Sequence, residues 1–185
     1  MSQIEKEMLE TKRLILRPIK EDDDTAIFEY SGNPNVGPNA GWKPHESIEE
    51  TREIINAVFL GKENVFGIVL KDSSTLIGSV GLVEDPKREN DKVKMLGYAI
   101  GEAYWGNGYT TEAASAVIEH GFNNLKLDLI SAYCYPFNNR SKHVLEKLGF
   151  SYEGKLSQCE KRFDGIVLDD ECYALSAESF NNISV

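Results

Sequence analysis

The chain has 185 residues, with 20 basic and 30 acidic side chains and a formal net charge of −10. Hydrophobic residues make up 41% and charged residues 27%, a composition typical of a globular protein rather than a disordered one. We expect one domain, spanning residues 1–185 with its core at about 11–178. The acidic balance argues against direct nucleic-acid binding, which needs a basic face. It suits a basic substrate, and the alternative is an acidic surface that serves only solubility.

The cysteines and apolar runs restrict the cellular setting. Cys134, Cys159 and Cys172 are widely spaced and form no Cys-x-x-Cys pair, which argues against a disulfide framework. The histidines show no metal-ligand spacing with each other or with the cysteines, so no metal site is expected. No apolar run is long enough to span a membrane, and residues 1–10 lack a signal-peptide core. We expect a cytoplasmic protein.

The first third of the chain predicts a strand, a helix and a long loop. Residues 13–18 alternate partially between apolar and polar and predict a strand that a proline ends. Asp22 is a good N-cap for a helix reaching about Tyr30. Residues 31–44 contain three prolines, three glycines and three asparagines, which predict a loop. A loop of this length is a candidate binding element.

The middle of the chain begins with a second helix and continues with strands. Ser47 and Glu50 have the spacing of a capping box and open this helix. Three runs rich in apolar residues follow, separated by polar turns. They are expected to be strands at Val65 to Leu70, Thr75 to Val83 and Val93 to Ile100.

The remaining elements complete a mixed α/β sheet. A glycine-rich turn at 105–108 precedes a third helix, and residues 127–135 predict a buried strand. Asn138 can cap a fourth helix, which Gly149 ends. Two final strands are expected near Ser151 to Ser157 and Ile166 to Leu175. The fold class predicted from these elements is α/β (α+β), with about seven strands and about four helices.

The glycine-rich turn has the chemistry of an anion site. A strand that leads through Gly106 and Gly108 into a helix presents backbone N–H groups at the positive end of that helix. Glycine lets the backbone approach a phosphate closely. The third glycine of a dinucleotide fingerprint and the Gly-Lys-Ser/Thr of a P-loop are both missing. A purely structural turn is the alternative for the two glycines taken alone.

Residues around this turn carry a family resemblance. Residues 104–113 read Tyr-Trp-Gly-Asn-Gly-Tyr-Thr-Thr-Glu-Ala. In this stretch the chain resembles the GNAT superfamily of N-acetyltransferases, and more narrowly its RimJ/RimL-like branch, which includes ribosomal-protein N-terminal acetyltransferases. Trp105 and Thr110 depart from the broad superfamily pattern, Gln/Arg-x-x-Gly-x-Gly/Ala, but fit the branch. The resemblance extends to residues 11–18, 41–45, 138–150 and 164–173.

The resemblance implies a GNAT-type domain with a mostly antiparallel sheet and acetyl-CoA (coenzyme A) as donor. In this family the strand edge at Tyr98, Ala99 and Ile100 pairs with the pantetheine arm of the donor. The pyrophosphate is held by the turn, here Trp105, Gly106, Asn107, Gly108, Tyr109, Thr110 and Thr111. Asn138 contacts the cofactor arm in family members, and its alternative is a simple helix N-cap.

Two residues are implied in proton transfer. Ser141 lies where related enzymes place a hydroxyl that protonates the sulfur of coenzyme A, and the tyrosine used by other GNAT enzymes is replaced by Leu145. An ordinary helix-start serine is the alternative. Glu160 lies near the position of a proposed base, with a solvated strand-end carboxylate as its alternative. Met95 occupies the place where family members often carry Glu.

The implied acceptor is an amine. Trp42 and His45 fall in the substrate-side loop and are candidate acceptor contacts, although core packing would explain Trp42 and solvation would explain His45. A protein or peptide N-terminal α-amine, including a basic protein N-terminus, is the leading acceptor. A polyamine, an aminoglycoside or an amino-acid derivative is an alternative, as is a non-catalytic acyl-CoA-binding module. The family also makes a homodimer an expected partner state.

Overall fold

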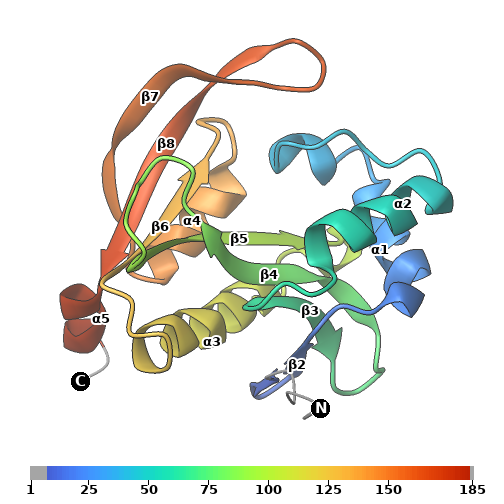
Figure 1. Cartoon of the computed structure of the whole chain (residues 1–185), viewed down its shortest axis with the longest axis horizontal. Coiled ribbons are helices and arrows are strands. Elements are labelled where there is room, and N and C mark those ends of the chain that lie inside the picture. Colours follow the sequence, from blue (N-terminus) through green and yellow to red (C-terminus); the bar gives the residue numbers. More distant parts are fainter. Residues whose placement is uncertain (1–7, 184–185) are drawn as a thin grey trace.

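The structure is a computed structural model of the chain, and it describes residues 8–183. Across this part of the chain, eight strands form one sheet (Figure 1). They are β1 (Leu9–Glu10), β2 (Leu14–Arg17), β3 (Val65–Leu70), β4 (Leu76–Glu84), β5 (Val93–Ile100), β6 (Leu129–Cys134), β7 (Ser151–Lys161) and β8 (Val167–Ser176). Their order is β1-β2-β3-β4-β5-β6-β8-β7, and every neighbouring pair is antiparallel except β5 and β6.

Helices cover both faces of the sheet. Between residues 8 and 183 the α-helices are α1 (Asp24–Ser31), α2 (Ile48–Ile54), α3 (Tyr109–Asn123), α4 (Asn139–Lys147) and α5 (Ala177–Ile183). A π-helical turn, Ile55–Phe59, extends α2. Ile27 and Ile55 pack with Val69 and Ala99 on one face of the sheet. Helices α3 and α4 pack on the opposite face, so β3 and β4 are buried on both sides.

The burial of α3 follows from its sequence. Its apolar residues recur at helical spacing and form a stripe that faces the sheet. Every side chain of this stripe is less than 8% exposed: Ala113, Ala114, Val117, Ile118 and Phe122. Leu145 of α4 is fully buried in the same cluster. This packing fixes the first turns of both helices relative to the sheet.

Strands β5 and β6 pair over a short distance and then separate. Their parallel ladder has three residue pairs and ends where Met95 lies opposite Ser131. Beyond this point β5 continues beside β4 to Ile100, while β6 continues beside β8 to Cys134. The edge of residues 96–100 that faces β6 therefore has no strand partner. This opening between β5 and β6, which we call the strand opening, positions the candidate site.

The predicted fold class is confirmed, and several boundaries agree with the pattern. Strands β3 and β5 have the predicted bounds. The sheet gains the two-residue β1 and the fold gains α5, which were not predicted, because elements this short carry too few residues for a periodic pattern. The cap predicted at Asp22 is wrong by one residue. Asp23 occupies the N-cap position of α1, and its carboxylate binds Arg17 and the amide of Lys20.

Within residues 8–183, no helix is both long enough and apolar enough to cross a bilayer.

The buried strand β3 provides a stability prediction. Ile68 is fully buried, so Ile68→Ala should lower the free energy of unfolding by about 2–5 kcal/mol, the usual cost of such a cavity. Urea denaturation monitored by circular dichroism measures this loss. Val167→Ala, at a position 51% exposed, serves as the control and should change stability by less than about 0.5 kcal/mol. Equal losses in the two variants would contradict the assignment of the core.

Candidate active site

The glycine-rich turn before α3 is built to receive an anion. Gly106 and Gly108 have φ angles of +78° and +77°, the left-handed region that favours glycine, and Gly108 is the N-cap of α3. A Cβ at Gly106 would meet no atom within 4 Å, so the space beside this residue is open. Within the described chain, the amides of residues 106–111 have no recorded hydrogen-bond acceptor. These N–H groups and the positive end of α3 suit a phosphate.

The connection between β1 and β2 holds this turn from one side. Both carboxylate oxygens of Glu112 accept hydrogen bonds: Oε1 from the Thr11 hydroxyl at 2.6 Å and the Arg13 amide at 2.8 Å, and Oε2 from Arg13 Nε at 2.6 Å. Arg13 Nη1 also donates to the carbonyl oxygen of Asn107 at 3.0 Å. Burial alone would raise the pKa of Glu112, but these hydrogen bonds outweigh it and hold the pKa below its ordinary value.

The other side of the turn contacts α4. Trp105 Nε1 donates to the carbonyl oxygen of Ile100 at 3.0 Å, which fixes the indole at the end of β5. The guanidinium of Arg140 lies 3.8 Å from the centre of the Trp105 ring, in a cation–π contact. Residues from β5 and α4 thus meet next to the turn. Sequence reasoning missed this contact because nothing in the pattern relates two residues so far apart in the chain.

Ser141 lies in the first turn of α4 and is bonded across the strand opening. The hydroxyl groups of Ser141 and Tyr98 are 2.8 Å apart, and Tyr98 also lies 3.3 Å from the Ser141 carbonyl oxygen. Burial raises the pKa of Tyr98, so its phenol keeps its proton at neutral pH. A phenol is a better donor than an aliphatic hydroxyl. With Tyr98 as the donor, the hydroxyl proton of Ser141 is not used in this bond and is left for another acceptor.

Both polar atoms of the Asn138 side-chain amide form hydrogen bonds. Its Oδ1 accepts a hydrogen bond from the Ser141 amide at 3.2 Å, which is the N-cap interaction expected at the start of α4. Its Nδ2 donates to the carbonyl oxygen of Asn39 at 3.1 Å. The predicted capping role is therefore present in the structure. The second bond ties the loop between α1 and α2 to the start of α4.

Glu160 lies on β7 and is bonded to a tyrosine that the sequence analysis did not select. The hydroxyl of Tyr135 donates to Glu160 Oε1 at 2.5 Å. Ser131, Tyr133 and Tyr135 alternate with the core residues of β6 and so point to the opposite face of the sheet. This alternation is the sequence signal that would have identified Tyr135.

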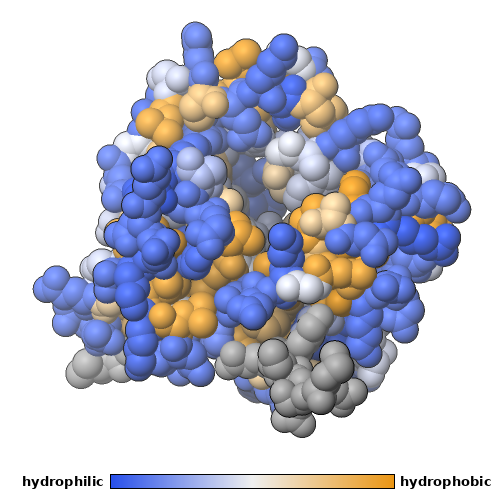
Figure 2. All heavy atoms as spheres, viewed as in Figure 1, coloured by the Kyte–Doolittle hydropathy of each residue, from blue (hydrophilic) through white to orange (hydrophobic). Residues whose placement is uncertain are grey.

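The loop between α1 and α2 approaches the same place. Pro38 accepts a hydrogen bond from Arg162 Nη1 at 3.3 Å, which joins the loop to the β7–β8 hairpin. In Figure 1 this hairpin, orange to red, rises above the sheet, and the light-blue segment after α1 lies across from it. Figure 2 shows that the surface between them is hollowed on this face. The loop, the hairpin and α4 therefore surround one cleft next to the strand opening.

The two predicted acceptor contacts on the loop occupy different surroundings. Trp42 packs against the core formed with α1, and its buried Nε1 has no hydrogen-bond partner among the described residues. His45 is 7% exposed, and its Nδ1 lies 2.9 Å from the hydroxyl of Thr51 on α2. Burial lowers the pKa of His45, which keeps the ring neutral at pH 7. Both side chains therefore support the loop from within.

The cysteines of the described residues form no disulfide bond. Cys134 and Cys172 are buried and free, and Cys159 is exposed and free. From residue 8 to residue 183, no cluster of three potential metal ligands is present. Met95, at the last paired position of β5, contributes no proton acceptor.

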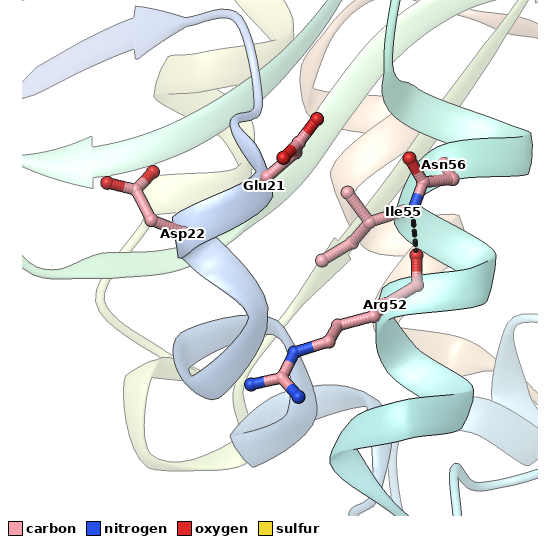
Figure 3. A pocket seen from close by; sticks show the side chains of 5 residues that line it. All are labelled: Glu21, Asp22, Arg52, Ile55 and Asn56. Atoms are coloured by element: carbon pink, nitrogen blue, oxygen red, sulfur yellow. Dashed lines mark hydrogen bonds between the residues drawn. The ribbon is translucent and has the colours of Figure 1, made fainter.

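A separate pocket of about 340 Å³ lies between the 3₁₀ turn Glu21–Asp23 and α2. Figure 3 shows its lining: Glu21, Asp22, Arg52, Ile55 and Asn56. The Arg52 guanidinium is bonded to Asp24 at 2.6 Å, and the side chain of Asn56 is bonded to the backbone of Arg52. None of the lining residues belongs to β5, β6 or α4, so this pocket is distinct from the cleft at the strand opening.

Comparison with known proteins identifies related chains. The family described as "Acetyltransferase (GNAT) domain" matches residues 13–151. The N-acetyltransferase YoaA of Bacillus subtilis is 36% identical over 158 residues, which cover 82% of this chain and 86% of YoaA. A GNAT-family acetyltransferase structure from Bacillus anthracis superposes with a TM-score of 0.82 at 27% identity, covering 93% of this chain and 99% of that one.

Two further relatives have names that state an acceptor. The spermidine N(1)-acetyltransferase of Escherichia coli is 25% identical over 142 residues, covering 76% of this chain and 74% of its own. The structure of a ribosomal-protein-S5-alanine acetyltransferase from Vibrio fischeri has a TM-score of 0.74 at 23% identity, covering 94% of this chain and 98% of its own. The latter likeness shows the fold alone.

The bonds of Glu112 generate a prediction on stability and pH. Glu112→Gln keeps the shape but removes the charge, and should lower the free energy of unfolding at pH 7 by about 1–3 kcal/mol. The folded-state pKa lies below the unfolded value, so the contribution is present above the unfolded pKa and is lost as pH falls through the folded one. The difference from wild type should therefore shrink between pH 7 and pH 3.

Urea unfolding at several pH values measures this difference. Glu29→Gln, at an exposed position on α1, is the matched control and should stay close to wild type throughout. A loss in Glu112→Gln that does not change with pH would contradict the electrostatic origin of the effect.

Proposed function

The chain belongs to the GNAT acetyltransferase family and is an acyltransferase, and from this premise we propose that it transfers an acetyl group directly to a primary amine, with a protein or peptide N-terminal α-amine as the preferred acceptor. One observation carries the proposal. The hydroxyl of Ser141, in the first turn of α4, lies 2.8 Å from the hydroxyl of Tyr98 on β5, the strand that borders the opening. The opening thus combines an anion site with a positioned proton donor.

The residues around the opening fit acetyl-CoA, the donor that GNAT acetyltransferases use. The free amides of residues 106–111 would hold the pyrophosphate, and the unpaired edge of β5 at Tyr98, Ala99 and Ile100 would pair with the pantetheine arm. Arg140, stacked on Trp105, adds a positive charge close to the turn. When bound, the donor would supply an acetyl group activated as a thioester.

Two residues would then move protons. Glu160 would take a proton from the amine nitrogen as the new C–N bond forms at the acetyl carbon. Ser141 would give its hydroxyl proton to the sulfur as the C–S bond breaks. Ser141 would regain a proton from solvent, and Glu160 would release one there. Each residue returns to its starting state, and the products are an amide and a free thiol.

The weakness of the available base favours an α-amine. At pH 7, removing the proton from an α-amine of pKa ~7.7 costs about 1 kcal/mol, whereas a Lys side chain of pKa ~10.4 costs about 4.6 kcal/mol. Met95 occupies the position where related enzymes often carry a Glu, which leaves Glu160 as the proposed proton acceptor. A single carboxylate partly open to water suits the α-amine, because this acceptor needs less free energy to lose its proton.

Two alternatives remain distinct from this proposal. The spermidine N(1)-acetyltransferase among the relatives supports a small-molecule amine, such as a polyamine, an aminoglycoside or an amino-acid derivative. The net charge of −10 suits either kind of basic acceptor. A non-catalytic acyl-CoA-binding module would agree with Met95 but would leave Ser141 and Glu160 without a role.

The proposed function includes a family branch, a cellular compartment and an oligomeric state. We place the protein in the RimJ/RimL-like branch and in the cytoplasm, where acetyl-CoA and new polypeptides are both present. The turn sequence Tyr-Trp-Gly-Asn-Gly-Tyr-Thr-Thr-Glu-Ala supports the branch. A homodimer is the oligomeric state we propose, and sedimentation of the purified chain measures it.

A panel of acceptors tests the proposed chemistry by thiol release from acetyl-CoA. The panel contains hexapeptides starting with Ser or Ala, blocked peptides with one internal Lys, spermidine and an aminoglycoside. We expect kcat/KM for the free N-termini to exceed that for blocked Lys peptides at least about tenfold, because less free energy is needed for deprotonation. Comparable turnover of the blocked Lys peptides would contradict the α-amine preference. Turnover confined to spermidine would establish the small-molecule alternative.

Replacing the proposed proton donor gives a second test. Ser141→Ala should lower kcat about 10²-fold or more while leaving the KM for acetyl-CoA close to wild type, since general acid catalysis contributes about that much. The exposed Ser157 provides the matched control, and Ser157→Ala should retain full activity. If Ser141→Ala turned over at the wild-type rate, Ser141 would be only a helix residue.

A further inference from the structure

We propose that Tyr135 is a positioning residue that orients the Glu160 carboxylate toward the acceptor amine, and that the absent side chain at Gly41 leaves room for this hydrogen-bonded pair. The inference rests on the proposed amine acetyltransferase activity and names the part of the chain that seats the acceptor nitrogen. The fold brings together three residues from separate parts of the chain. Tyr135 lies in the connection between β6 and α4, Glu160 lies on β7, and Gly41 lies in the loop between α1 and α2.

The first observation is that Glu160 differs from the acidic residues around it. Five other carboxylates of the β7–β8 hairpin are neutralised by basic side chains. The pairs are Glu153 with Arg88, Asp164 with Arg162, Asp169 with Lys155, Asp170 with Lys87 and Glu171 with Lys142. Within residues 8–183 the structure records no ion pair for Glu160, although Arg162, which is paired with Asp164, interacts electrostatically with it. No basic side chain bonds the Glu160 carboxylate, which can therefore bind a substrate ammonium group.

The second observation is that Tyr135 bonds only one of the two carboxylate oxygens of Glu160. The Tyr135 hydroxyl donates to Oε1 at 2.5 Å, and no donor is recorded for Oε2 in the described part of the chain. Tyr135 is 4% exposed and packs against the ring of Phe137, with ring centres 5.3 Å apart, so the phenol itself is held in place. One oxygen is thus fixed by the protein, and the other is left for the amine.

Burial and the neighbouring Glu160 carboxylate raise the pKa of Tyr135. The phenol therefore remains protonated at neutral pH and acts on Glu160 as a hydrogen-bond donor. A donor of this kind stabilises the ionised carboxylate, the form that binds an ammonium group and accepts a proton.

The third observation concerns the backbone of Gly41, which lies directly over this pair. A Cβ at Gly41 would lie 3.2 Å from the Tyr135 hydroxyl oxygen and 3.3 Å from Glu160 Oε1. The loop is held in this place by the bonds from Asn138 to Asn39 and from Arg162 to Pro38. A methyl group at position 41 would press on both of these oxygens and shift the hydrogen-bonded pair, and with it the oxygen left for the amine. Glycine is the residue that leaves the pair undisturbed.

A double-mutant cycle tests the role of Tyr135. The variants are Tyr135→Phe, Glu160→Gln and the two combined, assayed with the Ala-initiated hexapeptide and with spermidine. Tyr135→Phe should lower kcat/KM for the acceptor about tenfold, while the KM for acetyl-CoA stays at the wild-type value. The double variant should be no slower than Glu160→Gln alone, because Tyr135 acts through Glu160.

Independent losses would overturn the inference. If the two single effects multiply in the double variant, Tyr135 acts elsewhere, and if Tyr135→Phe equals wild type, it has no role. Calorimetry of the same two acceptors with the coenzyme A complex supplies a readout separate from turnover. Acceptor Kd should rise in Tyr135→Phe, while the Kd for coenzyme A itself should not change.

Gly41→Ala tests whether the Tyr135–Glu160 pair needs the space beside Gly41, with Gly61→Ala as its matched control. Both glycines have a left-handed φ, +92° and +73°, so both variants carry a similar backbone strain. A Cβ at Gly61 would meet no atom within 4 Å, whereas one at Gly41 would meet the Tyr135–Glu160 pair. Gly41→Ala should lower acceptor kcat/KM at least about tenfold, and Gly61→Ala should retain full turnover. Equal activity of the two variants would overturn the role of Gly41.

The outcomes separate the inference from the function on which it rests. A wild-type protein that binds coenzyme A but acetylates no amine would overturn the proposed function and the inference together. An active wild type whose Tyr135→Phe and Gly41→Ala variants are equally active would overturn the inference alone.

Discussion

The candidate site depends on the point at which β5 and β6 stop pairing. Backbone N–H and C=O groups need partners, and a sheet normally supplies them from the neighbouring strand. Here the parallel ladder ends at Met95 and Ser131, and both strands continue in the sheet only through their outer neighbours. The inner edge of β5 is left with unused hydrogen-bonding groups. An extended ligand can satisfy these groups, so the interruption creates the site.

The interactions that cross the strand opening are specific and few. Tyr98 on β5 bonds Ser141, and Arg140 stacks on Trp105, which follows β5 in the glycine-rich turn, so both contacts reach the first turn of α4. Charged partners such as Arg13 and Glu112 are kept on the outer side of the glycine-rich turn. The turn is therefore fixed from outside while its amides remain free.

The acceptor side relies on a selective distribution of charge. A protein with a net charge of −10 offers many carboxylates to a basic substrate, and most would be unproductive. The hairpin formed by β7 and β8 pairs its other carboxylates with Lys or Arg and leaves Glu160 to a neutral phenol. Non-specific attraction is thereby reduced along the hairpin. The remaining attraction is concentrated next to the cleft that the loop encloses.

The sequence by itself determined the features that depend on short-range patterns. Strands β3 and β5, the stripe of α3, the caps at Ser47 and Asn138 and the glycine-rich turn all arise from residues within a few positions of each other. Only the tertiary structure decided which side chains meet across the opening. Tyr135 and Glu160 are 25 residues apart, and Asn138 and Asn39 are 99 apart. Periodicity does not predict contacts between residues so far apart in the chain, because these contacts are set by the order of the strands and by the packing of helices on both faces of the sheet.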